Sequence, residues 1–138
     1  MYKSGVGGMG ISWVIQNKYV KIVQAKGATV VLVTPVTRRG SNGTANYKSH
    51  VAYAEGLVKL GKEYNIPVID MTTKTAELYT QLYNSGGADA TAELHCYSDD
   101  TRISIDNTHL SIKGCTIIAD MIAEETANLN LKISEKLK

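Results

Sequence analysis

The stretch that decides the fold is TVVLVTP, Thr29 to Pro35. A second run, IPVIDM, Ile66 to Met71, complements it further along the chain. The first is a continuous β-branched and apolar run, which is typical of a strand buried on both faces, and a proline ends it. The second is a shorter apolar run with Pro67 at its entry. Both runs therefore predict strands of a parallel sheet.

Apolar residues at helical spacing flank these two strands and predict the remaining elements. The predicted helices are residues 12–26, 47–64, 73–83 and 111–126, the last with the apolar stripe Ile112, Cys115, Ala119 and Ile122. Residues 36–46 and 85–110 read as irregular, with room for a short strand at 93–97. Alternating helices and apolar strands predict an α/β fold with a parallel sheet and right-handed crossovers.

Two strands are too few for an ordinary sheet, since a lone parallel pair leaves an unpaired edge on each strand. We therefore expect residues 1–138 to form a single domain or the C-terminal part of a larger one. Residues 1–11 read as a flexible, Gly-rich lead-in and residues 127–138 as a tail. Self-association is another way to cover the open strand edges.

The composition is that of a globular protein. The 138 residues are 43% hydrophobic and 20% charged, which excludes a disordered chain, a coiled coil and a collagen. No apolar stretch is long enough to cross a membrane, and the first residues lack the apolar core of a secretory signal, so no compartment is predicted.

Charge is distributed unevenly along the chain. Residues 1–54 hold seven basic residues and no acidic residue, whereas residues 55–138 hold eight basic and thirteen acidic residues. The basic residues are spread out rather than clustered, so neither a nucleic acid nor a membrane surface is predicted as a partner.

Neither a metal nor a cofactor is predicted. Cys96 and Cys115 fit no CxxC pair and read as reduced, mostly buried thiols, and with the nearby histidines they match no zinc-ligand spacing. Gly5 to Gly10 matches GxGxxG, but dinucleotide binding also needs a preceding strand and an acidic residue about 20 positions on, and both are missing.

The run Asp106-Asn107-Thr108-His109 carries the most chemistry, and it lies just before the helix predicted at 111. A carboxylate three residues before a histidine, on a turn, can accept a hydrogen bond from Nδ1–H and leave Nε2 free as a general base. The alternative is a side chain that caps the helix beside an exposed histidine. We predict that Asp106 and His109 lie within hydrogen-bonding distance on a loop before the last long helix.

Three runs of the chain are AKGATVVLVTPVTRR (Ala25–Arg39), KEYNIPVIDMTTKTAELY (Lys62–Tyr79) and DNTHLSIKGCTIIADMIAEE (Asp106–Glu125). Together they resemble the SGNH/GDSL-type hydrolases, most of all the rhamnogalacturonan acetylesterase group of carbohydrate esterases. The resemblance covers residues 15–126. It implies a three-layer α/β/α, flavodoxin-like fold and ester hydrolysis that removes acetyl groups from an acidic pectic polysaccharide. It also implies that His109 is the general base and Asp106 its orienting acid.

The family's nucleophile block, Gly-Asp-Ser, is absent from these 138 residues, and no Gly-x-Asn-Asp block precedes residue 25. The chain therefore resembles the C-terminal part of the family's domain, without its N-terminal strands. A base and an orienting acid without a nucleophile and an oxyanion hole should catalyse little acyl transfer. Arg38, Arg39 and Asn107 are candidate substrate-binding residues, since ligands of open α/β sheets bind at the carboxyl ends of strands, and both arginines follow such an end.

Two functions are compatible with these features. The first is an ester hydrolase of this family. The second is a catalytically incomplete remnant or fragment that binds saccharide or assembles with another chain, and the missing nucleophile and the open strand edges favour it.

The apolar run Val30–Val33 also predicts how the isolated chain behaves. Because it has one convincing strand partner, we expect an exposed strand edge or apolar patch, and hence marginal stability, self-association or aggregation. Size-exclusion chromatography with light scattering, followed by thermal melting, measures both properties. A monodisperse monomer that melts sharply above about 60 °C would contradict the expectation.

Overall fold

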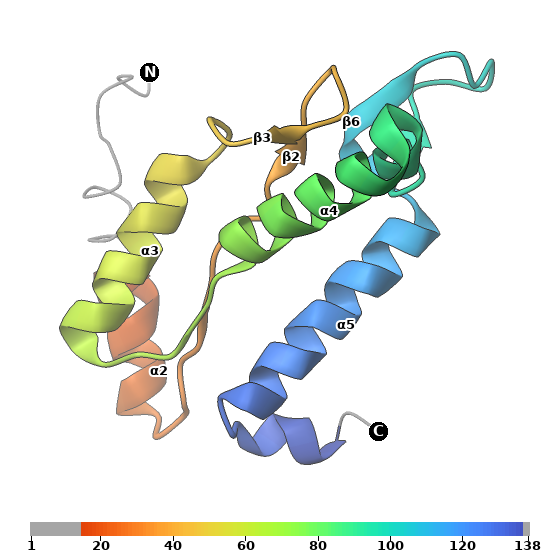
Figure 1. Ribbon diagram of the computed structural model, residues 1–138. Helices are drawn as coiled ribbons and strands as arrows, with labels where there is room; N and C mark the ends of the chain where they lie inside the picture. The colour runs from red at the N-terminus through yellow and green to blue at the C-terminus, as the bar shows by residue number, and fades with distance from the viewer. Residues whose placement is uncertain (1–14, 137–138) are drawn as a thin grey trace. The chain divides into compact units, whose positions relative to one another are not determined.

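The computed structural model describes residues 15–136, and the chain divides into two compact units (Figure 1). Of the described residues, the first unit comprises those up to Pro35 together with His50–Thr72, and the second comprises Val36–Ser49 and those from Thr73 onward. Helices and short strands alternate, one strand pair is parallel, and the expected α/β class is confirmed at that level. The GxGxxG match lies outside the described residues.

The first unit contains the predicted parallel strand pair. β1 (Leu32–Val33) pairs with β4 (Val68–Ile69), with Leu32 opposite Val68. α3 (Val51–Tyr64) connects the two strands, as the sequence predicted. Both strands are shorter than expected, and Val33 is 44% exposed, so residues 15–136 do not cover β1 on both faces.

The first predicted helix, 12–26, is described from residue 15 onward, and α3 is shorter than predicted. η1 (Gln16–Val20), a π-helical turn, continues into α2 (Lys21–Ala25). α3 begins at Val51 rather than at 47, because His50 has a left-handed φ of 62° and ends the preceding turn. These elements pack around one apolar cluster, made of Val20, Leu32, Leu57, Leu60 and Ile66.

The second unit begins with a strand hairpin. β2 (Arg38–Arg39) pairs antiparallel with β3 (Ala45–Asn46), so the polar stretch 36–46 is a hairpin rather than the predicted loop. α4 spans Met71–Ala92, and non-helical dihedral angles at Gly86 and Gly87 break it where the sequence predicted a stop. The helix resumes after this break, because residues 88–92 contain no further helix breaker.

A second hairpin follows α4 and precedes the last long helix. β5 (His95–Tyr97) pairs antiparallel with β6 (Ile105–Leu110). β5 lies within the short strand predicted at 93–97, whereas the rest of the stretch predicted to be irregular, 85–110, contains a helix end and the strand β6. α5 (Ile112–Asn128) comes next and extends into the predicted tail, where the 3-10 helix η2 (Lys132–Lys136) follows. Figure 1 shows α5 leaving the base of this hairpin.

A close backbone approach fixes α5 against the end of β5. Ser111 caps the helix: its Oγ accepts the Gly114 amide at 3.2 Å, while its own amide donates to the Leu94 carbonyl at 2.9 Å. A Cβ at position 114 would lie 2.1 Å from the Leu94 carbonyl oxygen. Glycine is therefore required at this contact for its small size.

This contact also turns α5 so that the predicted apolar stripe does not face the core. Ile112 is 89% exposed and Cys115 is exposed, whereas Ile117 packs against the buried cluster of Ala45, Ala76, Tyr79 and Leu94. Cys96 is exposed as well, so the expectation of buried thiols was wrong for both cysteines.

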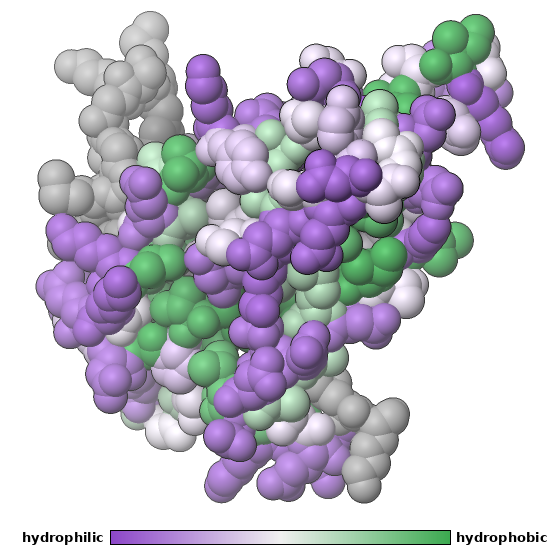
Figure 2. All heavy atoms as spheres, in the orientation of Figure 1, coloured by the Kyte–Doolittle hydropathy of each residue, from purple (hydrophilic) through white to green (hydrophobic). Residues whose placement is uncertain are grey.

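Hydrophobic side chains are visible on the surface of the molecule. Figure 2 shows them in the region of α3 and at the tip of the hairpin that joins β5 to β6. Ile103, in that hairpin, is 86% exposed. Of the helices in the described part of the chain, none has the length and apolarity needed to span a bilayer.

The close approach of Gly114 to the Leu94 carbonyl predicts how a substitution at position 114 changes stability. Glycine to alanine in a helix normally raises stability, but in Gly114→Ala the added methyl group must displace the Leu94 carbonyl. We expect the free energy of unfolding to fall by about 1–3 kcal/mol, measured by urea denaturation followed by circular dichroism. Thr116→Ala, at an exposed position of the same helix, is the control and should be neutral or stabilising. A Gly114→Ala chain as stable as the wild type would contradict the packing described here.

Candidate functional site

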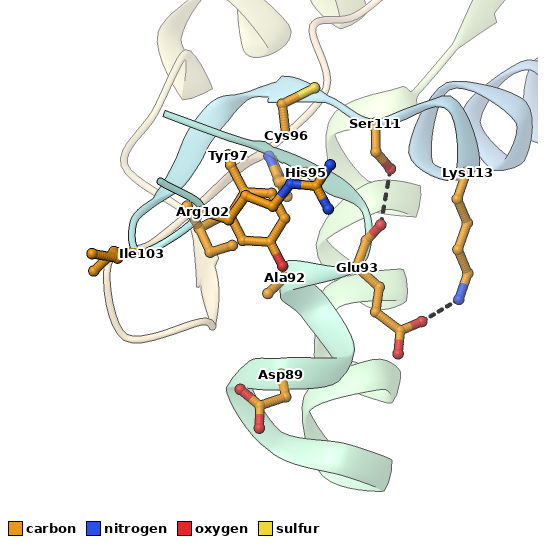
Figure 3. Close-up of a pocket in the computed structure, with 11 residues that line it drawn as sticks. Asp89, Ala92, Glu93, His95, Cys96, Tyr97, Arg102, Ile103, Ser111 and Lys113 are labelled. Carbon is orange, nitrogen blue, oxygen red and sulfur yellow. Dashed lines mark hydrogen bonds and ion pairs between the residues drawn. The ribbon is translucent and has the colours of Figure 1, made fainter. Parts of the chain in front are cut away.

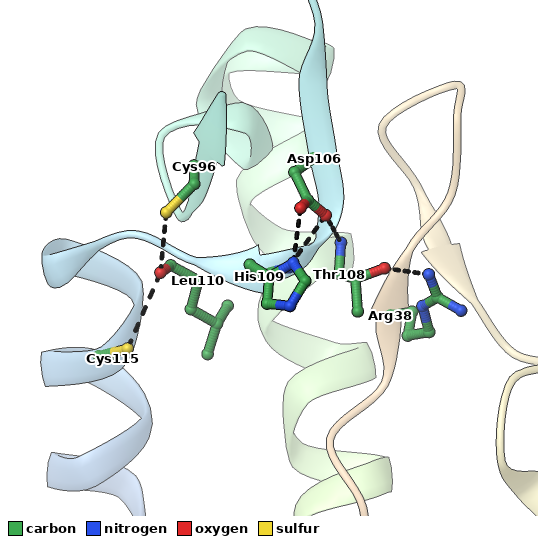
Figure 4. Close-up of polar contacts among 7 residues, drawn as sticks. All are labelled: Arg38, Cys96, Asp106, Thr108, His109, Leu110 and Cys115. Atoms are coloured by element: carbon green, nitrogen blue, oxygen red, sulfur yellow. Dashed lines mark hydrogen bonds and ion pairs between the residues drawn. The ribbon is translucent and has the colours of Figure 1, made fainter. Parts of the chain in front are cut away.

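Asp106 and His109 form a hydrogen-bonded pair on β6 (Figure 4). The His109 Nδ1 lies 2.6 Å from Asp106 Oδ2, which is the contact that their spacing predicted. Because an ionised carboxylate only accepts hydrogen bonds, Nδ1 carries the proton in the neutral ring, and that tautomer leaves the lone pair of Nε2 available. The imidazole is 77% exposed at its side chain, so Nε2 is open to a reactant.

The pair lies on a strand and not on the predicted loop, but the strand is irregular there. A regular strand would direct residues three apart to opposite faces. The ladder between β5 and β6 shifts register between its pairs, and Asp106 Oδ1 accepts the backbone amides of Thr108 at 2.7 Å and of His109 at 3.1 Å. This local turn brings the His109 ring back over the carboxylate.

The same hydrogen bonds set the charge of the carboxylate. The bond from the His109 side chain, followed by those from the Thr108 and His109 amides, lowers the pKa of Asp106 to about 2. Asp106 is therefore ionised at any pH near neutral and keeps the imidazole oriented.

Arg38, Arg39 and Asn107, the three residues expected to bind substrate, lie next to the pair of Asp106 and His109 but differ in their contacts. Arg38 is exposed and donates from its guanidinium to the Thr108 hydroxyl. Arg39 is 7% exposed, and its Nη1 donates to Asn107 Oδ1 at 2.6 Å. Arg39 and Asn107 thus bind each other, and Arg38 keeps part of its guanidinium at the surface.

A buried polar pair that the sequence analysis did not single out lies in the same unit. The Tyr79 hydroxyl and His95 Nε2 are 2.7 Å apart, and both side chains are at most 5% exposed. Burial raises the pKa of Tyr79 to about 12, and burial lowers the pKa of His95. Tyr79 therefore donates to a neutral His95. Helical spacing places Tyr79 on the same side of α4 as Ala76, and only the tertiary contact reveals the partner of its hydroxyl.

A hollow lies beside β5, between the end of α4 and the start of α5 (Figure 3). The Arg102 guanidinium lies over the Tyr97 ring, 5.9 Å from its centroid, and Lys113 pairs with Glu93. The lining is of mixed charge, and neither residue of the hydrogen-bonded pair on β6 belongs to it. Within residues 15–136, no group of three or more His, Cys, Asp or Glu side chains is placed to hold a metal ion.

Comparison with known proteins finds a similarity to one esterase. No family model matches this chain. Among curated proteins, it is similar to a rhamnogalacturonan acetylesterase of Bacillus subtilis (strain 168), with 31% identity over 122 residues. The similarity covers 81% of this chain and 50% of that protein, so the chain spans about half the length of the curated relative it matches. The chain is thus distantly similar, over most of its length, to an acetylesterase.

The pair makes a prediction about titration. In His109→Ala the largest cause of the lowered pKa is lost, so the pKa of Asp106 should rise from about 2 toward the ordinary aspartate value of 3.8, while the two amide hydrogen bonds hold it somewhat below. Carboxyl carbon chemical shifts, followed by NMR against pH, measure this. Because the folded-state pKa is depressed, any stability linked to Asp106 is present above pH 4 and lost as the pH falls toward 2.

Asp99 is the internal control for that titration. The Thr101 side chain and amide lower its pKa, and His109 is not among the causes, so its titration should be the same in both proteins. An Asp106 that titrates near 3.8 in the wild type would contradict the geometry described above.

Proposed function

We propose that this chain supplies the base and the orienting acid of an ester hydrolase site. His109 is the general base and Asp106 holds its ring and its tautomer. The 2.6 Å contact between Nδ1 and Oδ2, on a ring whose Nε2 faces solvent, is the observation that carries the proposal. Similarity to an acetylesterase over 81% of the chain supports the same class of reaction.

The chemistry follows from the arrangement of the two side chains. His109 Nε2 removes the proton of a serine hydroxyl as that oxygen attacks an ester carbonyl, and later returns it to the departing alcohol. Asp106 stays ionised and stabilises the imidazolium that forms in between. The serine is not assigned within these 138 residues, which contain no Gly-Asp-Ser block, and we propose that a separate segment provides it.

The proposed substrate is an acetylated acidic polysaccharide of the pectic type, and the proposed fold of the whole enzyme is the three-layer α/β/α arrangement of SGNH hydrolases. The name of the Bacillus subtilis relative supports the substrate, and the parallel β1–β4 pair with its connecting helix is compatible with the fold. Arg38 is well placed to meet a carboxylate of such a substrate, since it is exposed and lies beside Thr108.

The second candidate is a module without catalysis, which binds saccharide or assembles with another chain. The missing nucleophile block and the exposed Val33 on β1 favour it. The two candidates differ in whether any hydrolysis depends on His109.

Acetyl release tests the proposal. We expect the in-frame region upstream in the gene to encode a Gly-Asp-Ser block, and the polypeptide that includes it to hydrolyse p-nitrophenyl acetate and acetylated rhamnogalacturonan. In that polypeptide His109→Ala should lower kcat by about 10²–10⁴-fold, because it removes the general base. His50→Asn, which suits the left-handed backbone at position 50, is the control histidine and should leave the rate unchanged.

Two results would count against catalysis. One is an extended polypeptide in which His109→Ala is as active as the wild type. The other is an upstream region without a nucleophile block, together with equal background rates for this chain and its His109→Ala variant. The second result favours the saccharide-binding or assembly module.

A further inference from the structure

The side chain of Arg39 is buried although it carries a charge. It is 7% exposed, and four uncharged oxygen atoms accept its hydrogen bonds. Burying a guanidinium against neutral partners is costly compared with leaving it in water. The burial of Arg39 is explained by the groups that its guanidinium holds in place.

The guanidinium joins three elements of the second unit. From β2, Arg39 Nε donates to Thr91 Oγ1 at 3.0 Å and Nη2 donates to the Ala88 carbonyl at 3.0 Å, both on α4. Its Nη1 donates to Asn107 Oδ1 on β6 at 2.6 Å. Thr91 is fully buried and donates in turn to Ala88, so the acceptors on α4 are themselves fixed.

The strand held in this way is the one that carries the hydrogen-bonded pair. Asn107 lies between Asp106 and Thr108, inside the turn that the Asp106 carboxylate closes. Arg38 holds Thr108 from the exposed side of β2, while Arg39 holds Asn107 from the buried side. Two neighbouring arginines of β2 therefore hold two neighbouring residues of β6, Asn107 and Thr108.

The buried pair of Tyr79 and His95 lies within the electrostatic reach of the same guanidinium. The Arg39 charge lowers the pKa of both groups, as a smaller contribution beside that of burial. The backbone groups of Asp106 and His109 act in the opposite direction and raise the pKa of the His95 imidazole. The Arg39 guanidinium thus acts electrostatically on both members of the buried pair.

We propose that Arg39 is a positioning residue, whose guanidinium holds Asn107 and thereby keeps Asp106 and His109 in the turn that joins them. This differs from the substrate contact expected from the sequence. The consequence for catalysis rests on the proposed function, whereas the effect on the geometry of the pair does not.

The first test reads the geometry directly. Long-range nitrogen–proton NMR spectra distinguish a His109 protonated at Nδ1 from one protonated at Nε2. The wild type should show the Nδ1–H form, and Arg39→Lys should show a mixture, because one ammonium group cannot replace a guanidinium that reaches four acceptors. The pKa of Asp106 should rise from about 2 in the same variant.

Two further variants make the test decisive. Asn107→Ala removes the contact with β6 but leaves Arg39 bound to α4, so it answers the question where Arg39→Lys fails to fold. It should change the tautomer in the same direction. Arg102→Lys makes the same substitution at an exposed arginine and should change neither reading. A folded Asn107→Ala chain with an unaltered tautomer and an unaltered Asp106 titration would overturn the proposal.

Kinetics separate this proposal from the proposed function. In the polypeptide that hydrolyses p-nitrophenyl acetate, Arg39→Lys should lower kcat by about 10- to 100-fold with little change in KM, as expected of misplaced catalytic groups. A raised KM with unchanged kcat would instead identify Arg39 as a substrate contact and overturn the proposal. An altered tautomer in a protein without esterase activity would leave the positioning role standing and refute the proposed function.

Discussion

The Asp106 carboxylate is the group on which the candidate site depends. One of its oxygen atoms accepts two backbone amides and so bends β6, while the other accepts the imidazole Nδ1–H of His109. Conformation and chemistry therefore have a single cause, since the turn that brings the ring over the carboxylate is closed by that same carboxylate. Removal of its charge would loosen the backbone and release the ring together.

The parts of the fold that the sequence predicted are those with a local apolar signal. The runs around Leu32 and Val68 contain too few polar residues for any other assignment, and they pair in parallel as expected. A short strand was also predicted where β5 lies, but β6 has no such signal, because polar residues and a register shift interrupt its alternation. The side of α5 that faces the core was mispredicted for another reason. It depends on how closely Gly114 approaches Leu94, and this contact is absent from the periodicity of the helix.

In the candidate site too, the contacts between residues close in sequence could be predicted and those between distant residues could not. The spacing of Asp106 and His109 is short-range, and the distance between them could be predicted from it. The burial of Arg39 could not, because a polar stretch with two adjacent arginines reads as a solvated loop. Its acceptors Thr91 and Asn107 lie 52 and 68 residues further along the chain, so only the folded structure brings them together.

The exposure of His109 determines what the pair can do. With 77% of its side chain open to solvent, its interaction with Asp106 is screened by a medium of high dielectric constant. A base of this kind becomes an efficient catalyst when a further surface excludes water around Nε2 and places a nucleophile within about 3 Å of it. In the proposed enzyme, a segment that brought the serine and also covered the imidazole would meet both conditions. The pair is thus preorganised by its own strand and by Arg39, and its catalytic power depends on what is placed against it.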